Sequence, residues 1–269
     1  MSNQDKNTNI PTNVTWITGA SSGLGLKLAQ ALAKQGDLII ASARDESALD
    51  VLSKSTPNII PLPCDITDKA SLLSAATYIR ENFSSLDRII LNAGTCEYLN
   101  FPDPEWAAIR RVMEVNYFGT ISCLEIALPL LRASKSQPHI AVIASQASLA
   151  PFPRAEAYGA SKAALQYFFD SLRIDMASEN IDVTIINPGF VDTPLTRKNN
   201  FKMPFLIDAE NAAKRITRCI RKHPREINFP RRLKWILMLS NVMPVTWDKL
   251  VAINLPSRKP IPRRSTNKQ

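Results

Sequence analysis

The sequence predicts an α/β fold in which helices cover both faces of a parallel sheet of about seven strands. Two observations lead to this prediction. Short apolar runs rich in β-branched residues alternate along the chain with longer runs of helical periodicity. At 269 residues, the chain is long enough to bury a full core. We therefore expect a three-layer, doubly wound sheet of the Rossmann type, followed by a helical C-terminal extension.

Composition limits the class of protein. The chain is 45% apolar and 21% charged, which is typical of a soluble globular protein. No stretch approaches the roughly 20 apolar residues of a membrane-spanning helix, and the polar segment 1–13 does not look like a signal peptide. The four cysteines show no CxxC spacing. We therefore expect reduced thiols, a cytoplasmic location and no metal site.

The net charge of +9 is distributed unevenly. Residues 214–269 carry 15 Lys and Arg against two acids, a net charge of +13, whereas residues 1–213 have a net charge of −4. The basic character therefore belongs to the C-terminal fifth of the chain. We do not expect nucleic acid binding, because no interleaved aromatic residues or known module accompany these cations.

The first expected strand, 14–17, is followed by TGASSGLG at 18–25 and by an amphipathic helix from 26 to 33. Backbone N–H groups at the start of such a helix favour an anionic pyrophosphate. The spacing is G-x-x-x-G-x-G, which differs from the common dinucleotide fingerprint G-x-G-x-x-G. The strand before the turn and the helix after it still predict a phosphate-binding loop.

The second expected strand, 38–42, is followed by Ala43 and Arg44. Enzymes that use NAD usually have an acid here, which binds the ribose hydroxyls. A guanidinium in place of that acid suits a 2′-phosphate, so we predict that NADP is favoured over NAD. The alternative is that Arg44 is a solvated loop residue and that Asp45 or Glu46 supplies the acid.

The remaining elements continue the alternation. The expected strands are 59–62, 88–91, 140–144, 183–186 and an edge strand at 226–229. The expected helices are 68–83, 104–131 with Pro104 in its first turn, 156–179, and 208–222 with Asp208 as N-cap. Ligands of parallel sheets bind at the carboxyl ends of the strands, so we expect one site from the residues that follow them. These are Gly19, Arg44, Asp65, Asn92, Ser145 and Pro188-Gly189.

Tyr158 and Lys162 lie four residues apart in the expected helix 156–179, and such residues share a helix face. A nearby ammonium stabilises a phenolate and lowers the pKa of the phenol. Tyr158 would then be able to act as an acid/base at a carbinol oxygen. This pair alone fits a surface lysine one turn from a tyrosine better than it fits a catalytic pair. The residues at the strand ends favour the catalytic interpretation.

Taken together, these motifs resemble the short-chain dehydrogenase/reductase family in its single-domain form of about 250 residues. The resemblance covers roughly residues 13 to 195. It rests on TGASSGLG, on CDIT at 64–67, on NAG at 92–94, on Asn116, on Ser145 thirteen residues before the YxxxK at 158–162, and on NPGFVDT at 187–193.

The resemblance implies roles for four catalytic residues. Tyr158 would be the general acid/base, and Lys162 would lower its pKa and bind the nicotinamide ribose. Ser145 would hold the substrate oxygen, and Asn116 would maintain a local break in its helix and anchor a water that relays protons.

The resemblance also implies a cofactor-binding set. Asp65 would approach the adenine, Asn92 the adjacent ribose, and Val191 and Thr193 the nicotinamide carboxamide. Arg44 stands where NADP-preferring members carry a basic residue, whereas Ser22 replaces a second basic residue found in some of them. The full set is Gly19, Ser21, Ser22, Gly23, Leu24, Gly25, Arg44, Asp65, Ile66, Asn92, Ala93, Gly94, Tyr158, Lys162, Pro188, Gly189, Val191 and Thr193.

The implied reaction is hydride transfer between NADP(H) and a small-molecule carbonyl or secondary alcohol. Loop residues near the site are mostly large and apolar, which favours a bulky or lipophilic substrate: Cys96, Tyr98, Gln146, Leu149, Phe152, Phe190 and the segment 195–206 with Phe201, Met203 and Phe205. They would equally serve to pack a lid against the body. A non-catalytic NADP-binding regulator on the same fold is the alternative function. Many members pair through the two long helices, so we expect a homodimer through 104–131 and 156–179.

We divide the chain into a disordered segment 1–12, a catalytic domain 13–229, an amphipathic helical extension 230–257 and a basic disordered tail 258–269. Trp235 and Trp247, with their flanking Arg and Lys, leave three roles open for residues 230–255. The extension would lie at a membrane interface, cover the substrate pocket or contact a partner subunit.

Overall fold

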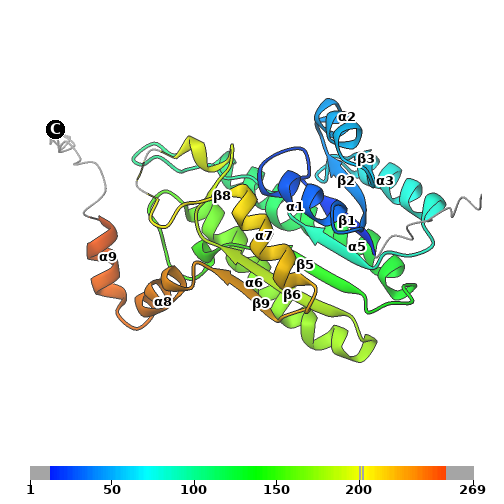
Figure 1. Ribbon diagram of the computed structural model, residues 1–269. Helices are drawn as coiled ribbons and strands as arrows, with labels where there is room; N and C mark the ends of the chain where they lie inside the picture. The colour runs from blue at the N-terminus through cyan, green and yellow to red at the C-terminus, as the bar shows by residue number, and fades with distance from the viewer. Residues whose placement is uncertain (1–12, 200, 202, 253–269) are drawn as a thin grey trace, which may run out of the picture.

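The computed structural model describes residues 13–199, 201 and 203–252, so the segments predicted to be disordered, 1–12 and 258–269, lie outside it. Its centre is a seven-stranded, fully parallel sheet in the order β3-β2-β1-β4-β5-β6-β9 (Figure 1). The strands are β1 (Val14–Thr18), β2 (Leu38–Ala43), β3 (Ile59–Pro63), β4 (Arg88–Leu91), β5 (His139–Ile143), β6 (Asp182–Pro188) and β9 (Glu226–Phe229). The predicted three-layer, doubly wound fold is therefore confirmed.

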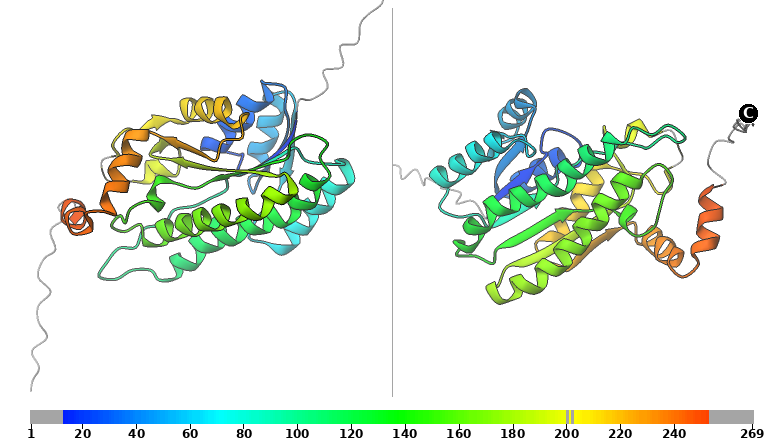
Figure 2. Two further views of the ribbon diagram at one scale, coloured as in Figure 1. Left: turned by 90° about the horizontal axis from the view of Figure 1, so that it is seen from below. Right: turned by 180° about the vertical axis from the view of Figure 1, so that it is seen from behind.

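Helices cover both faces of the sheet (Figure 2). One face carries α1 (Gly23–Ala33), α2 (Glu46–Ser55) and α7 (Ala209–Ile220), whose apolar residues form one core cluster with the sheet. The other face carries α3 (Lys69–Asn82), α4 (Ala107–Met113), α5 (Gly119–Arg132) and α6 (Glu156–Met176). Asp208 caps α7 as predicted, because its carboxylate accepts a hydrogen bond from Asn211 N.

The two core clusters arise from the pleat of the strands. Successive side chains of a strand point to opposite faces, so neighbouring apolar residues belong to different clusters. Trp16 and Ile40 pack on the α5–α6 face, whereas Ile17 and Ile39 pack on the α1–α7 face. All four side chains are fully buried. Continuous apolar runs are what a sheet covered on both faces requires.

The helix predicted for 104–131 is interrupted. Residues Glu114–Phe118 form a π-helical turn between α4 and α5, and Asn116 lies at its centre. The prediction that Pro104 lies in the first helical turn is wrong. Glu105 and Trp106 first form i→i+3 turns, and regular helix begins only at Ala107. A proline also disfavours helical conformation in the residue before it, here Asp103.

A two-stranded sheet that the sequence analysis did not predict lies beside the main sheet. It pairs β7 (Val191–Asp192) with β8 (Ile207–Asp208) in parallel. Short 3-10 turns occur at Gln146–Ser148, Ala177–Glu179 and Thr196–Lys198. The segment between β7 and β8, which contains the last of these turns, therefore leaves and rejoins the body next to the carboxyl end of β6.

Polar side chains at the amino ends of the strands form a network. Arg88, which opens β4, pairs with the fully buried Asp37 before β2 at 3.2 Å. Arg88 Nε also donates to Nδ1 of His139, which opens β5, at 3.3 Å. The other nitrogen of that ring, Nε2, lies 2.8 Å from Thr184 Oγ1. Because Nδ1 accepts a hydrogen bond, His139 is neutral and carries its proton on Nε2.

The second histidine of the chain belongs to the same network. The rings of His139 and His223 stack with centroids 4.0 Å apart, and His223 Nδ1 lies 2.8 Å from Asp182 Oδ2. Burial lowers the pKa of His139 well below 6.5, and the charges of His223 and Arg88 lower it further. The amino ends of the strands are therefore joined by charged and polar side chains that satisfy one another.

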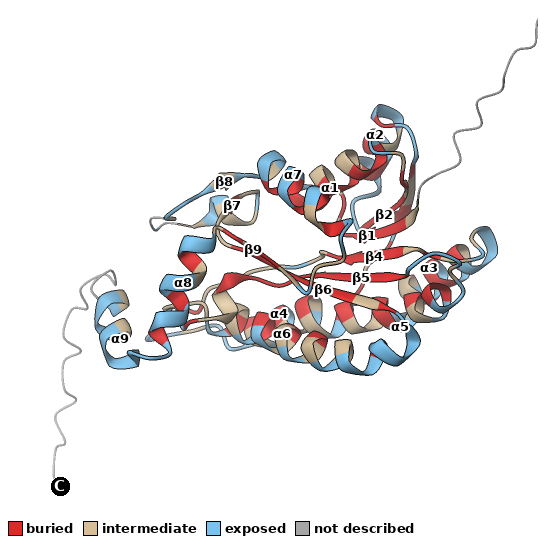
Figure 3. Ribbon diagram, turned by 60° about the horizontal axis from the view of Figure 1, so that its bottom comes forward, coloured by how far each residue is buried: buried red, intermediate tan, exposed pale blue. Residues whose placement is uncertain are grey.

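The predicted helical extension is present as α8 (Arg231–Ser240) and α9 (Pro244–Ala252). Leu233 and Leu237 of α8 are buried against Ala150 and the partly buried Phe152. By contrast, α9 has no buried residue (Figure 3). None of the helices in the described part of the chain has the length and apolar character needed to cross a membrane.

Candidate active site

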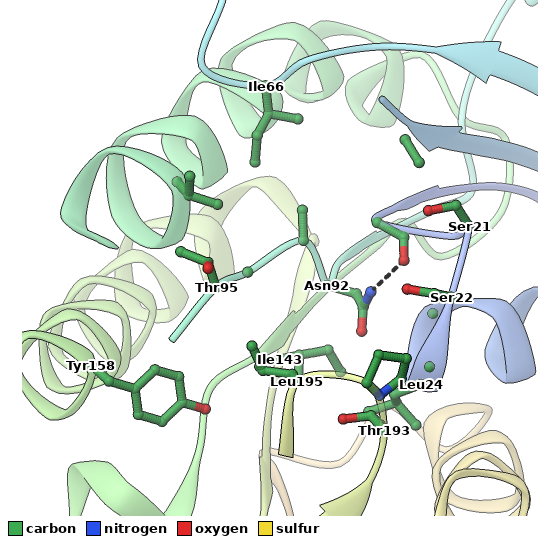
Figure 4. A pocket seen from close by; sticks show the side chains of 18 of the residues that line it. Ser21, Ser22, Leu24, Ile66, Asn92, Thr95, Ile143, Tyr158, Thr193 and Leu195 are labelled. Atoms are coloured by element: carbon green, nitrogen blue, oxygen red, sulfur yellow. Dashed lines mark hydrogen bonds between the residues drawn. The ribbon is translucent and has the colours of Figure 1, made fainter. Parts of the chain in front are cut away.

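A cavity of about 940 Å³ lies at the carboxyl ends of the strands. It extends from the turn after β1 to the phenol of Tyr158, which points into it (Figure 4). Every residue predicted to bind the cofactor lines this cavity, as do Ser145, Tyr158 and Lys162. The structure therefore brings the residues that follow the separate strands into one site, as expected for a parallel sheet.

The glycine turn after β1 has a backbone that other residues would not tolerate. Gly19 has a φ of +69°, and a Cβ at this position would lie 2.8 Å from Ala93 Cα. A Cβ on Gly25 would lie 2.2 Å from Gly19 O and 2.4 Å from Asn92 Nδ2. The inner side of the glycine turn therefore packs directly against the end of β4, which only glycine allows. The glycines of the turn also line the cavity.

The start of α1 differs from that of three other helices. In α2, α3 and α7, an aspartate at the N-cap accepts a hydrogen bond from the backbone. In α1 the N-cap is Ser22, whose side chain makes no capping bond, and the first turn carries no acid. Backbone N–H groups and the positive end of the helix dipole therefore face the cavity, where they suit a phosphate.

Two neighbouring residues after β2 differ in how they are engaged. Asp45 caps α2, because its Oδ1 accepts hydrogen bonds from Ala48 N at 3.0 Å and from Ser47 Oγ at 2.8 Å. Arg44 is exposed at the cavity and makes no ion pair within the described residues. Burial raises the pKa of Asp65, but hydrogen bonds from Thr67 and the charge of Arg44 leave it below its usual value. Of Arg44 and Asp45, only Arg44 is therefore available to bind a ligand.

Tyr158 and Lys162 share the inner end of the cavity. Lys162 Nζ lies 5.9 Å from the centre of the Tyr158 ring and donates a hydrogen bond to Ile143 O at 2.8 Å. Burial raises the pKa of Tyr158 to about 12, and a hydrogen bond with Ser145 opposes that rise. Burial lowers the pKa of Lys162 to about 8. The pKa of Tyr158 therefore lies above that of a free phenol, which is the opposite of the direction predicted from the Lys162 ammonium.

Sequence comparison identifies the family to which this site belongs. The profile of the short chain dehydrogenase family matches residues 13–203. The chain belongs to the short-chain dehydrogenase family. It is therefore an oxidoreductase that acts on CH–OH and C=O groups, as the sequence analysis predicted.

Individual relatives agree with this assignment. An "Uncharacterized oxidoreductase" of Myxococcus xanthus is 32% identical over 232 residues, covering 85% of this chain and 91% of the relative. The "11-beta-hydroxysteroid dehydrogenase-like 3" of Arabidopsis thaliana is 32% identical over 251 residues, covering 89% of this chain and 80% of the relative.

Solved structures share the fold. A short chain dehydrogenase from Burkholderia cenocepacia in complex with NADP has a TM-score of 0.75 and 25% identity, with 92% of this chain and 99% of that chain covered. A 3-ketoacyl-(acyl-carrier-protein) reductase from Brucella melitensis complexed with NADH has a TM-score of 0.71 and 24% identity, with 78% of this chain and 90% of that chain covered.

In this short-chain dehydrogenase, Asn116 does not line the cavity but lies behind it, fully buried. Its Oδ1 accepts from Thr95 N at 2.7 Å, and its Nδ2 donates to Thr95 O and Ser161 Oγ, each at 2.9 Å. A Cβ on Gly94 would lie 3.3 Å from this Oδ1 and 3.6 Å from Lys162 Nζ. Asn116 therefore joins the end of β4 to α6 beside the lysine, and the π-helical turn carries the helix break that the family resemblance implies.

The loop residues predicted to contact substrate pack mainly on one another. The rings of Tyr98 and Phe201, and those of Phe201 and Phe190, meet edge to face about 6 Å apart. Leu149, Phe152 and Phe190 contact the cluster around α8. None of these five residues is among those lining the 940 Å³ cavity. These contacts favour the alternative that they pack the segment after β7 against the body.

Thr18 positions the glycine turn, a role that the sequence analysis did not assign to it. Its Oγ1 accepts hydrogen bonds from Asn92 N at 3.0 Å and Ala93 N at 3.1 Å, and Asn92 Nδ2 donates to Thr18 O at 2.9 Å. These bonds fix the glycine turn to the end of β4. The sequence does contain an indication of this role, because Thr18, a residue with a hydroxyl group, comes directly before the first glycine of the turn.

A charged group at the rim of the cavity was also missed. Glu97 and Arg111 both line it, and their side chains pair at 2.6 Å. They lie fourteen residues apart in segments without a recognisable motif, so spacing alone gave no indication of this pair.

Proposed function

We propose that the protein transfers hydride between NADP(H) and a carbonyl or secondary alcohol, with Tyr158 as the general acid/base. The observation that carries this proposal is the shared cavity. The glycine turn and the uncapped start of α1 lie at one end of it, and Tyr158, Ser145 and Lys162 lie at the other. A dinucleotide with its phosphates at α1 would extend toward the phenol.

The protonated form of Tyr158 is the one that carbonyl reduction requires. A phenol with a pKa of about 12 is protonated at neutral pH, which is the form that donates a proton to an oxygen receiving charge. Ser145 would donate a second hydrogen bond to that oxygen. NADPH, when bound, supplies the hydride. Lys162, which Ile143 O holds in place, would bind the nicotinamide ribose and stabilise the phenolate that remains.

The preference for NADP rests on Arg44. The competing interpretation assigns the ribose contact to Asp45, but that carboxylate already caps α2. A guanidinium without a carboxylate partner suits a 2′-phosphate, which it can bind with two hydrogen bonds. The Burkholderia structure contains NADP and the Brucella structure contains NADH, so the proposal rests on Arg44 alone.

A bulky or lipophilic substrate is the class we propose. Two relatives from Arabidopsis thaliana are called 11-beta-hydroxysteroid dehydrogenase-like 3 and 2, and one from Arachis hypogaea is called 11-beta-hydroxysteroid dehydrogenase A. A hydroxysteroid is a large and mainly apolar alcohol. Tyr98, Phe201 and Phe190 contact one another edge to face, and Thr95 and Glu97, which lie just before Tyr98 in the chain, line the cavity.

A cofactor-oxidation screen tests the function. NADPH and NADH are compared over aliphatic, aromatic and steroid-like ketones at equal concentrations, and binding of each cofactor is measured separately by fluorescence. We expect turnover with NADPH and a large ketone. Tight NADPH binding without turnover on any carbonyl or alcohol would instead indicate the non-catalytic regulator.

A homodimer in the cytoplasm stays a prediction. Its support is a set of exposed apolar side chains on and beside the two long helices. Phe118 precedes α5, and Tyr167 and Ile174 lie on α6 with exposed fractions of 79% and 77%. Light scattering of wild type and of Ile174→Glu would test this contact, because the charge would separate the subunits of such a dimer.

A further inference from the structure

The C-terminal helices present an apolar surface that the rest of the described chain does not cover. One side of α8 is buried through Leu233 and Leu237, and its other side is exposed together with α9 (Figure 3). We call this surface the C-terminal face. Its exposed large apolar side chains are Trp235, Ile236, Met238, Leu239, Val242, Met243 and Val245.

Cations without carboxylate partners adjoin this face. Arg231 and Arg232 open α8, and Arg231 also lines a groove of about 490 Å³ between α7 and β9. Arg215, Arg218 and Lys222 line the same groove. None of these five cations forms an ion pair within residues 13–199, 201 and 203–252. The one carboxylate of the groove, Glu226, pairs with Lys234 at 2.9 Å.

We propose that the C-terminal face binds the surface of an anionic lipid bilayer. Tryptophan and aliphatic side chains flanked by Arg and Lys are the composition of helices that lie in the headgroup region. With ten and nine residues, α8 and α9 are too short to cross the bilayer, so they would lie parallel to it. The unpaired cations would contact the lipid phosphates.

Charge favours lipid over a second copy of the chain as the occupant. A two-fold contact places the same patch of both subunits face to face. The helices α8 and α9 carry Arg231, Arg232, Lys234 and Lys249 against the single acid Asp248. A second copy would bring the same excess of positive charge to the contact, whereas an anionic bilayer neutralises it.

The face is joined directly to loops at the carboxyl ends of the strands. Gln146 Nε2 donates to Pro230 O at 3.2 Å, and Trp247 Nε1 donates to Pro151 O at 2.8 Å. Leu233 packs on Gly189, where a Cβ would lie 3.0 Å from Leu233 Cδ2. Gly189 also lines the 940 Å³ cavity. Binding to a bilayer would therefore place lipid close to the site, although the proposal does not depend on turnover.

Vesicle co-sedimentation tests the proposal with the full chain. Vesicles of phosphatidylcholine alone are compared with vesicles containing 30% phosphatidylglycerol (on the order of the anionic content that attracts basic segments). We expect the protein to pellet with the anionic vesicles, less so in high salt. Each cation removed near the surface should weaken binding about fivefold, so Arg231→Ser/Arg232→Ser should bind markedly less.

Matched variants separate the face from general surface apolarity. Leu239→Glu and its control Leu73→Glu replace leucines that are both 57% exposed, one on α8 and one on α3. Trp235→Glu and Trp106→Glu form a second pair, at 68% and 63% exposed. We expect at least a tenfold loss of vesicle binding in the α8 variants only, with circular dichroism melts like wild type.

Several outcomes would overturn the proposal. Equal binding by Leu239→Glu and Leu73→Glu would show that the face is not the contact. No binding to either kind of vesicle by the folded wild type would exclude a bilayer as the occupant. A dimer that Leu239→Glu dissociates, without vesicle binding, would assign the face to a second copy of the chain.

Discussion

The two ends of the parallel sheet have opposite chemistry, although the same strands reach both. At the carboxyl ends, the start of α1 is uncapped, Arg44 has no carboxylate partner among the described residues, and a cavity of about 940 Å³ separates the loops. At the amino ends, Asp37, Arg88, His139 and His223 contact one another or nearby partners. Polar groups at strand ends are thus paired internally at one end and available to a ligand at the other.

This difference indicates which changes affect activity and which affect folding. A change to Arg44 or to the phenol hydroxyl of Tyr158, at the carboxyl ends, should leave the stability of the fold nearly unchanged, because Arg44 makes no ion pair within the described residues and Phe keeps the ring of Tyr158. A change at the amino ends leaves a buried partner unsatisfied, which destabilises the fold. The substitutions Tyr158→Phe, Arg88→Met and Arg44→Ser, together with mild acid, test this distinction.

Tyr158→Phe tests the carboxyl end. We expect turnover with NADPH to fall about a thousandfold or more, because general acid/base catalysis contributes about 10²–10⁴ and no other phenol lines the cavity among the described residues. NADPH affinity and the urea midpoint should stay close to wild type. Steady-state kinetics measure turnover, cofactor fluorescence measures NADPH affinity, and urea unfolding measures the midpoint. Full activity in this variant would rule out Tyr158 as the acid/base.

Arg88→Met tests the amino end. It removes the nearer ion-pair partner of the fully buried Asp37, at 3.2 Å, and leaves only Arg221 at 3.7 Å. We expect a loss of about 3 kcal/mol in the free energy of unfolding, the lower end of the range for breaking a buried pair. The double variant Asp37→Leu/Arg88→Met should recover part of that loss, because it removes both charges. Arg132→Met breaks the exposed pair with Glu179 and should leave the urea midpoint nearly unchanged. An equal shift in Arg88→Met and Arg132→Met would contradict the distinction between the two ends.

Arg44→Ser distinguishes the two cofactors. Hydrogen bonds to charged groups contribute about 1.5–3 kcal/mol, so we expect the KM for NADPH to rise about tenfold or more. The KM for NADH should change little. Asp45→Asn is the matched variant, because Asn also caps helices but carries no charge. If Asp45→Asn weakens NADH and Arg44→Ser leaves NADPH unaffected, the ribose contact belongs to the acid.

Mild acid should destabilise the amino end. The His139 pKa lies well below 6.5 in the folded protein, so the unfolded chain takes up the proton first as pH falls. Stability is then complete above pH 6.5 and decreases below it, by up to about 1.4 kcal/mol per pH unit for this group. Urea unfolding at pH 8, 6.5 and 5.5 measures the slope. His139→Gln should reduce this dependence of stability on pH. An unchanged slope in that variant would show that His139 does not cause the loss of stability in acid.

Much of the fold was predictable because the strands are continuous apolar runs. The predicted strand 88–91 coincides with Arg88–Leu91, and 226–229 coincides with Glu226–Phe229. A sheet buried on both faces requires such runs, and polar loop residues bound them clearly. Many of the cofactor-binding positions were predictable for a related reason, since they lie at or just after the carboxyl ends of strands, whereas Tyr158 and Lys162 were found from their spacing on a helix. Their binding roles stay predictions.

Other features had no signal within a short window of sequence. Strands of two residues, such as β7 and β8, are too short to show periodicity. The network of Arg88 and His139 joins residues 51 positions apart, and each reads alone as an ordinary polar residue at the start of a strand. The high pKa of Tyr158 was also missed. Helix spacing places Lys162 nearby but does not reveal how deeply both groups are buried.

The stacking of His139 on His223 has a consequence for enzymology, because the chain contains two histidines and both lie far from the catalytic end. Imidazole is the side chain whose ordinary pKa falls between 5 and 8, and it commonly causes inflections of rate in that interval. Here an inflection in a pH–rate profile near 8 would instead report the Lys162 ammonium. The imidazole NMR resonances, in turn, would monitor the opposite end of the molecule without any added label.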